Sequence, residues 1–212
     1  MNRKSRGESE EDPRYEISKH QLICENSRFA VFLDTVKQDG EIAIEDYMSI
    51  SPKTCNENQI TGVVTLPVEN GKYGLLKIYR PPIKDFSWEL PGGFIEPNET
   101  PALSAIRELK EEAGLVCEEK DLVHLGTFFP APGLVSGKLA IFSAEKCKPV
   151  SQAEETEFGI SRFEWFSEKE IEKSIEKGSI RDMATVLAIH RRTKLVSELA
   201  VRLQMNVDKE LI

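Results

Sequence analysis

Five glutamates lie within one short stretch, PGGFIEPNETPALSAIRELKEEAGL at residues 91–115, and three of them have helical spacing. At about 100° per residue, Glu108, Glu111 and Glu112 fall within an arc of about 100° on one side of a helix. Like charges three or four residues apart repel each other, so the arrangement is locally unfavourable unless a cation offsets it. Carboxylate oxygens in this pattern suit Mg²⁺, with Mn²⁺ as the alternative. A solvated acidic helix face is the competing interpretation.

The helix that carries these glutamates is predicted over residues 101–113. Thr100 can cap its N-terminus, Pro101 suits the first helical position, and Gly114 can adopt the left-handed conformation that ends it. An apolar stripe on this helix should pack on a sheet, and it consists of Ala102, Ala105, Ile106, Leu109 and Ala113.

The composition predicts a globular protein without broad contacts to nucleic acid or to a membrane. A chain of 212 residues with 40% hydrophobic and 30% charged residues can bury a substantial core. Its net charge of −8, with no basic run, argues against broad contact with nucleic acid or an anionic membrane. A polyanionic substrate would therefore be met locally, by a cation.

The four cysteines show no spacing that is typical of a metal site. Cys24, Cys55, Cys117 and Cys147 form no CxxC pair, and the three histidines do not complete a zinc pattern. No apolar stretch of signal-peptide type occurs near Met1. We expect free thiols in a reducing, cytoplasmic setting.

The chain is predicted to have three parts. Residues 1–14 read as a disordered tail, 15–56 as a small β-rich region with a hairpin turn at 38–40, and 57–212 as the main domain. Within the main domain, strands are expected in GVVTLPVENGKYGLLKIYR, FSWELPGGF, HLGTFFPAPG, KLAIFSAEK and SRFEWFS. Two helices are expected to finish the chain, at 168–177 and 181–203. This order favours a mixed sheet sandwiched by helices.

The stretch at 91–115 matches every fixed position of the Nudix box. The matching residues are Gly93, Glu99, Arg107, Glu108, Leu109, Glu111, Glu112, Gly114 and Leu115. The chain therefore resembles the Nudix hydrolases. The resemblance implies an α/β/α sandwich with a mixed sheet and a metal-dependent enzyme that cleaves a nucleoside diphosphate linked to another moiety.

Segments outside the box resemble the ADP-ribose pyrophosphatase branch of that family. They are ENSRFAVFLDTV, LLKIYRPPIKDFSWELPGGFIEPNE, PAPG at 130–133 and GSIRDMATVLAI. The chain departs from the branch at Gly92, where alanine is usual, and after PAPG, where LVSGK lacks an acidic residue. The resemblance implies hydrolysis of ADP-ribose or a related nucleoside diphosphate sugar to AMP and a sugar phosphate.

The same resemblance implies a metal-binding set. Glu108 and Glu112 are the expected principal ligands of Mg²⁺ or Mn²⁺, and the carbonyl oxygen of Gly92 is the expected backbone ligand. Glu111 is expected to be a shared or secondary member that also counts among the catalytic residues. Arg107 is expected to orient these glutamates, and Glu99 to brace the loop before the helix.

Candidate substrate-binding residues lie on the strands before the box. Arg80 could clamp phosphate through its planar guanidinium, or could be a surface charge at a strand end. Glu89 is a further candidate beside the box. Trp88 and Phe29 could stack on adenine, although aromatic residues in strands are more often part of the core.

The catalytic base is expected on the acidic segment SQAEETEFG. This segment offers Glu154, Glu155 and Glu157, of which Glu155 and Glu157 are the favoured candidates. A solvated acidic loop is the alternative.

The β-rich region at 15–56 is expected to join two subunits into a homodimer, as in the branch that the chain resembles. A monomer with a folded-back arm is the alternative. Two other functions stay open: a Nudix enzyme acting on NADH, a dinucleoside polyphosphate or a nucleoside triphosphate, and a non-catalytic module that senses a nucleotide.

Overall fold

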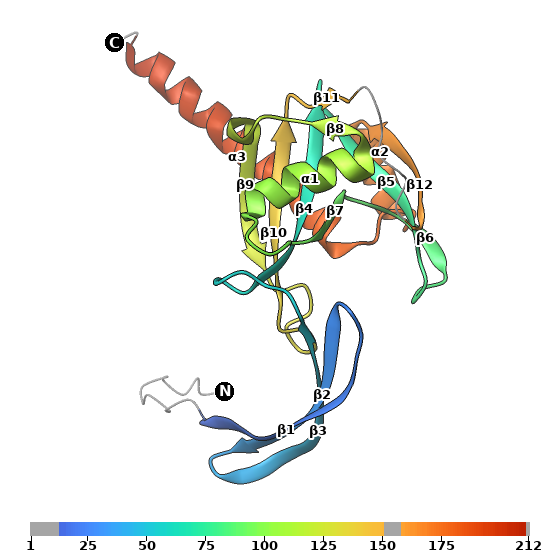
Figure 1. The fold of residues 1–212 in the computed structure, drawn as a ribbon. Coiled ribbons are helices and arrows are strands. Elements are labelled where there is room, and N and C mark those ends of the chain that lie inside the picture. Colours follow the sequence, from blue (N-terminus) through green and yellow to red (C-terminus); the bar gives the residue numbers. More distant parts are fainter. Residues whose placement is uncertain (1–12, 151–157, 211–212) are drawn as a thin grey trace. The chain divides into compact units, whose positions relative to one another are not determined.

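A computed structural model describes residues 13–150 and 158–210, with side chains to residue 202 (Figure 1). The chain divides into two compact units. The first runs to Lys53 and includes Ala131–Ser136, and the second comprises Thr54–Pro130 and the chain from Gly137 onward. No helix among the described residues is long and apolar enough to cross a membrane.

The N-terminal unit is an antiparallel sheet of three strands. Its order is β1 (Tyr15–Glu25), β2 (Phe29–Gln38) and β3 (Glu41–Pro52). Asp39 and Gly40 both have positive φ, at 51° and 91°, which is the conformation of a two-residue hairpin turn. The hairpin predicted at 38–40 is therefore confirmed.

Side chains also tie the three strands together. The buried carboxylate of Asp34 on β2 lies 2.5 Å from His20 Nδ1 on β1 and accepts a 2.7 Å hydrogen bond from Ser49 Oγ on β3. The segment at 131–136 belongs to the same unit, since Tyr47 Oη donates to the carbonyl of Gly133 at 2.7 Å. Nothing in the sequence predicted that this segment joins the N-terminal sheet.

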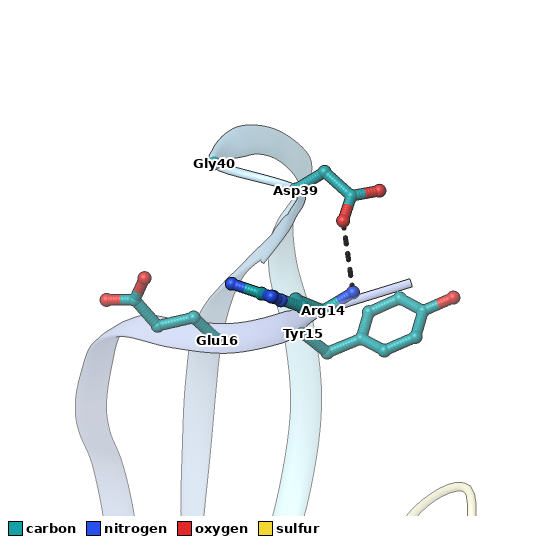
Figure 2. Close-up of a pocket in the computed structure, with 5 residues that line it drawn as sticks. All are labelled: Arg14, Tyr15, Glu16, Asp39 and Gly40. Carbon is teal, nitrogen blue, oxygen red and sulfur yellow. Dashed lines mark hydrogen bonds between the residues drawn. The ribbon is translucent and has the colours of Figure 1, made fainter. Parts of the chain in front are cut away.

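A cavity of about 480 Å³ lies beside the hairpin turn of the N-terminal unit (Figure 2). Figure 2 shows the backbone N–H of Arg14 donating to Asp39 Oδ1 at 3.1 Å, which fastens the start of β1 to the turn. The hollow is lined by Arg14, Tyr15, Glu16, Asp39 and Gly40. Because none of these residues has a role in the predicted chemistry, we do not place the active site here.

The second unit is built on a seven-stranded mixed sheet (Figure 1). Its main order is β12 (Ile160–Phe166), β5 (Lys72–Arg80), β4 (Ile60–Glu69), β10 (Lys138–Glu145) and β9 (Leu122–Phe128). Only β4 and β10 are parallel; the other neighbours are antiparallel.

Strands β4 and β5 form a hairpin that opens away from its turn. They pair only next to the turn, at Val68–Tyr73 and Glu69–Lys72. Farther along, β6 (Asp85–Glu89) pairs with β5 and β7 (Gly92–Phe94) pairs with β4. The chain between β6 and β7 therefore enters the space where the hairpin opens.

Helices cover both faces of the large sheet. On one face, α1 (Pro101–Ala113) packs through Ala105 on Val63 and Ala140. On the other, α2 (Glu168–Glu176) and α3 (Met183–Glu210) contribute Ile171 and Ala188 to the main core. The short elements β8 (Leu115–Val116), the 3-10 helix η1 (Glu119–Asp121) and β11 (Lys148–Pro149) complete the unit. The predicted α/β/α sandwich is confirmed.

Two expectations about element boundaries need correction. The stretch FSWELPGGF forms two strands rather than one, because Pro91 has no N–H to donate to a ladder; its carbonyl instead accepts from Thr65 N–H at 2.9 Å. The last helix was expected at 181–203 but begins at Met183 and continues to Glu210.

Candidate active site

Two glycines let strand β7 approach its neighbours closely. A Cβ atom on Gly92 would lie 2.2 Å from the carbonyl oxygen of Val63, and one on Gly93 would lie 2.4 Å from Glu108 Oε1. Real Cβ atoms do not come this close to other heavy atoms. In this structure the Gly92–Gly93 pair therefore lets β7 lie between β4 and the glutamates of α1.

Local signals set both ends of helix α1 where the sequence predicted them. Thr100 Oγ1 accepts the backbone N–H of Leu103 at 3.2 Å, and Pro101 stands at the first turn. Gly114 has φ 63° and donates its N–H to the last turn. These caps set where the helix begins and ends.

The three helix glutamates have different environments. Ala105 and Leu109 are buried as expected, but Glu108 is buried with them and is only 6% exposed. The side chain of Glu111 is 40% exposed. The sequence grouped Glu108 with the glutamates beside the apolar stripe, whereas the structure turns it inward, into the space that Gly93 leaves free.

Arg107 links the loop before the helix to two of these glutamates. Its Nε donates to Glu99 Oε1 at 2.9 Å, and its Nη1 donates to Glu108 Oε1 at 2.7 Å and to Glu111 Oε2 at 3.0 Å. Its Nη2 donates to the carbonyl of Phe94 at 3.0 Å. One planar guanidinium therefore positions carboxylates from two segments, which matches the expected role.

The pKa of Glu99 in this group is strongly lowered. The hydrogen bond from Arg107 is the main reason that the pKa of Glu99 falls to about 2, with Ser104 Oγ donating at 2.5 Å and Glu96 N–H at 3.2 Å. The same hydrogen bond raises the pKa of Arg107. The pair is therefore charged at neutral pH and holds the loop at the start of α1.

Glu112 connects the helix directly to strand β7. Its Oε2 accepts the backbone N–H of Gly92 at 2.6 Å. The structure thus brings together Gly92, Glu108, Glu111 and Glu112, all of which the sequence proposed as metal-binding residues.

The oxygen atoms at this site are of the chemical type that binds a hard divalent cation. Carboxylate and backbone oxygens are the ligands that Mg²⁺ and Mn²⁺ prefer. Within residues 13–150 and 158–202, however, no three acidic, histidine or cysteine side chains converge in a ready-made metal cluster. Arg107 donates hydrogen bonds to Glu108 and Glu111, and the N–H of Gly92 donates one to Glu112. The three carboxylates therefore lie near one another, but each accepts a hydrogen bond from the protein.

A second group of polar residues surrounds Arg80. Its Nε and Nη2 donate to Glu89 Oε2 at 3.0 and 2.7 Å, so two predicted substrate-binding residues are paired across β5 and β6. Burial lowers the pKa of Arg80, but the hydrogen bond and charge of Glu89, with the charges of Glu112 and Asp182, raise it overall. Arg80 thus lies within electrostatic reach of the acidic end of α1.

A cavity of about 470 Å³ opens beside this pair. It is lined by Arg80, Pro82, Ile83, Ser87, Glu89, Arg181 and Asp182. The sequence did not identify Ser87, Arg181 or Asp182. The stretch GSIRDMATVLAI was recognised as a closing helix, but nothing in its pattern showed that the residues before the helix reach this cavity.

Asp182 also supports the chain that leads into β7. Its Oδ2 accepts from Thr185 N–H at 2.8 Å and from Thr185 Oγ1 at 2.7 Å, and Thr185 Oγ1 accepts the N–H of Leu90 at 3.2 Å. The start of α3 is thereby fastened to the residue before Pro91.

The sequence also proposed Trp88, Phe29 and the acidic segment as parts of the site. Trp88 is part of the main core, and its ring centroid lies 4.8 Å from that of Phe166 in an edge-on contact. The sequence had left this core position open as the alternative to stacking on adenine. Phe29 is the first residue of β2 in the N-terminal unit. The candidate bases Glu155 and Glu157, and Glu154 beside them, fall outside the described residues.

Comparison with known proteins places this site in a family. The NUDIX domain model matches residues 59–186, more than half of the chain. The ADP-ribose pyrophosphatase of Bacillus subtilis is 30% identical over 124 residues, which cover 57% of this chain and 65% of that protein. A CMP-5'-(N-acetyl-N-hydroxy-3-aminopropyl)phosphonate hydrolase of Streptomyces rubellomurinus is 28% identical over 132 residues, which cover 61% and 59%. The matches thus span less than two thirds of either relative.

A solved structure shows the same fold. The crystal structure of an ADP compounds hydrolase superposes with a TM-score of 0.73 at 19% identity, over 88% of this chain and 96% of that one. With the glycine pair, the capped helix and its glutamates in place, the match over 59–186 leads to one conclusion: the chain belongs to the NUDIX family.

Proposed function

We propose that this chain is a metal-dependent hydrolase that cleaves the pyrophosphate of ADP-ribose, or of a related nucleoside diphosphate sugar, to AMP and a sugar phosphate. The observation that carries the proposal is the arrangement of Glu108, Glu111 and Glu112 against the Gly92–Gly93 strand. Relatives named ADP-ribose pyrophosphatase support the choice of substrate.

Glu108, Glu112 and the carbonyl of Gly92 are the residues that would hold Mg²⁺, with Glu111 as a shared or secondary ligand. Mn²⁺ would suit the same oxygen donors. When bound, the divalent ion neutralises diphosphate charge and makes hydroxide available at neutral pH. The chain's own part is to hold these acids close to β7, through Arg107 and the N–H of Gly92.

Arg80 binds the substrate's phosphate in this proposal. Its side chain is 49% exposed, pairs with Glu89 and lines the 470 Å³ cavity, so part of the guanidinium can meet an anion. Glu89 keeps the guanidinium in position. Trp88 and Phe29 are the proposed contacts of the adenine ring.

Hydrolysis needs a group that positions or deprotonates the attacking water. We assign this role to Glu155 or Glu157. Water attacks one phosphorus of the diphosphate, the bond from that phosphorus to the bridging oxygen breaks, and each product keeps one phosphate.

The N-terminal unit joins two copies of the chain in this proposal. Large apolar side chains on its strands are exposed to solvent in the single chain, namely Tyr15, Ile17, Leu22, Ile23, Ile42, Ile44 and Met48. Exposed apolar side chains on these three strands support an interface. Removal of residues 1–56 should give a monomer or an aggregate with poor activity, measured by light scattering and turnover. An active, well-behaved truncated monomer would rule out the dimer.

A substrate panel tests the proposed function. The full chain is incubated with Mg²⁺ and ADP-ribose, other ADP-sugars, NADH, diadenosine polyphosphates, deoxynucleoside triphosphates or a CMP-linked phosphonate, and kcat/KM is compared. We expect the highest value for ADP-ribose or another ADP-sugar. Preference for a triphosphate would favour the other Nudix chemistry, and binding without turnover of any compound would favour a sensing module.

A further inference from the structure

Two short strands hold the end of helix α1 against the end of β10. Strand β8 follows α1, strand β11 follows β10, and they pair antiparallel at Val116–Lys148 and Leu115–Pro149. One position farther along the same register, Cys117 stands opposite Cys147. The sequence showed no relation between these cysteines, which are 30 positions apart in the numbering.

The hydrogen-bond pattern shows which kind of pair these cysteines form. The N–H of Val150 donates to the carbonyl of Gly114 at 2.9 Å, so this position has the phase of a hydrogen-bonded pair, although the N–H of Gly114 itself caps α1. Such pairs alternate with non-hydrogen-bonded ones in an antiparallel ladder. The positions of Pro149, which has no N–H, and of Cys147 are therefore non-hydrogen-bonded. Opposite Cα atoms at such positions are about 4.5 Å apart, within the roughly 4.4–6.8 Å that a disulfide spans.

The side chains share one environment as well. Cys147 is 6% exposed and belongs to an apolar cluster with Leu109, Leu115 and Ala144. Cys117 packs against the same cluster and is partly exposed. Both sulfurs therefore lie on the same side of the β8–β11 pair.

We propose that Cys117 and Cys147 are a modification site, at which a reversible intrachain disulfide forms and fastens the end of α1 to the β10–β11 turn. The bond links the helix that carries Glu111 and Glu112 to the central sheet. In a reducing compartment the pair stays as two thiols, and an oxidant converts it.

The two thiols differ in exposure, since Cys117 is partly exposed and Cys147 is buried, and this sets the order of the steps. A hydrogen bond with Cys147 lowers the pKa of Cys117, and the same contact, with burial, raises the pKa of Cys147. The Cys117 thiolate attacks one sulfur of a small disulfide such as oxidised glutathione, forming a mixed disulfide and releasing one glutathione thiolate. Cys147 then attacks the Cys117 sulfur, and the second glutathione leaves as the thiolate while the Cys147 proton passes to solvent. Two protein thiols are oxidised and one glutathione disulfide is reduced.

The experiment uses the full chain with Cys24→Ser and Cys55→Ser, which removes the two exposed thiols. After incubation with oxidised glutathione, free thiols are alkylated and the intact mass is measured. We expect a mass two hydrogens below that of the reduced chain, no alkyl group, and a linked peptide pair that contains Cys117 and Cys147. The thermal midpoint should rise by roughly 5 °C or more, because the bond closes a loop of about 30 residues in the unfolded chain.

Matched controls carry a further Cys117→Ser or Cys147→Ser change. They should show no internal disulfide and no rise in thermal midpoint on oxidation. Two alkylated thiols after oxidation, a glutathione adduct on Cys117 beside a free Cys147, or a disulfide between two chains would each overturn the proposed bond. An internal bond without a rise in the midpoint would overturn its fastening role. The chemical readouts need no activity, so this test is independent of the proposed substrate.

Discussion

The backbone N–H of Gly92 donates to Glu112 Oε2 across 2.6 Å, and this hydrogen bond joins strand β7 to helix α1. The two residues are brought together by the opening of the β4–β5 hairpin, which admits β7 beside β4, and by the packing of α1 on the same face. The acidic end of the helix therefore lies at the strand rather than in solvent.

Replacement of Gly93 by alanine should disable the site while the fold persists. The new Cβ would lie 2.4 Å from Glu108 Oε1, so the buried carboxylate would have to move. We expect kcat to fall by roughly 10²-fold, as for the loss of one well-placed catalytic group. Gly133→Ala is the control, because its Cβ would meet only Tyr47 Oη at an ordinary 3.8 Å. Equal activity of the two variants would show that Glu108 need not occupy this position.

Stability should fall in acid partly because of Glu99. Its pKa is about 2 when folded, below the ordinary value of 4.5, so ionised Glu99 stabilises the folded chain above pH 4.5. This contribution is lost as the pH falls from about 4.5 through about 2, and it is at most about 3 kcal/mol. Urea unfolding of wild type and Glu99→Gln at pH 7 and pH 3 measures it. The difference between the two proteins should be larger at pH 7; a difference that does not change with pH would disprove the assignment.

Arg80→Lys should weaken substrate binding more than chemistry. Lysine keeps the charge but cannot hold both Glu89 and a phosphate with one planar group. We expect KM for ADP-ribose to rise by roughly 10-fold, the effect of losing one charged hydrogen bond. Lys194→Arg on α3 is a control for a conservative exchange in an exposed ion pair. An unchanged KM would show that Arg80 does not bind the phosphate and is only a surface charge.

The base should be revealed by glutamine substitutions at 155 and 157. Whichever glutamate positions the water, its replacement should lower kcat by roughly 10²–10⁴-fold with little change in KM. Single variants and the Glu155→Gln/Glu157→Gln double variant are compared by steady-state kinetics. A near-normal kcat in the double variant would place the base elsewhere.

Local chemistry made much of the fold predictable. Thr100 and Gly114 mark the two ends of α1 by capping, and Asn70–Gly71, both with positive φ, mark the β4–β5 turn; all four act through their own backbone or immediate neighbours. The resemblance to the Nudix box likewise grouped Glu112 and Gly92 as members of one site.

Features that depend on distant contacts were not predictable. The burial of Glu108 depends on how closely Gly93 approaches it, and helical periodicity contains no information about a neighbouring strand. The link from Asp182 through Thr185 to Leu90 joins positions about 90 residues apart. The same holds for Cys117 and Cys147, whose proximity follows from the β8–β11 register.

Product identification tests the central claim most directly. The full chain is incubated with ADP-ribose and Mg²⁺, and products are identified by mass for wild type, for Glu112→Gln and for the control Glu172→Gln on α2. We predict AMP and ribose 5-phosphate from wild type and control, turnover lower by roughly 10²-fold or more in Glu112→Gln, and none with a chelator. Orthophosphate or pyrophosphate as the main product, or full activity in EDTA, would contradict the account.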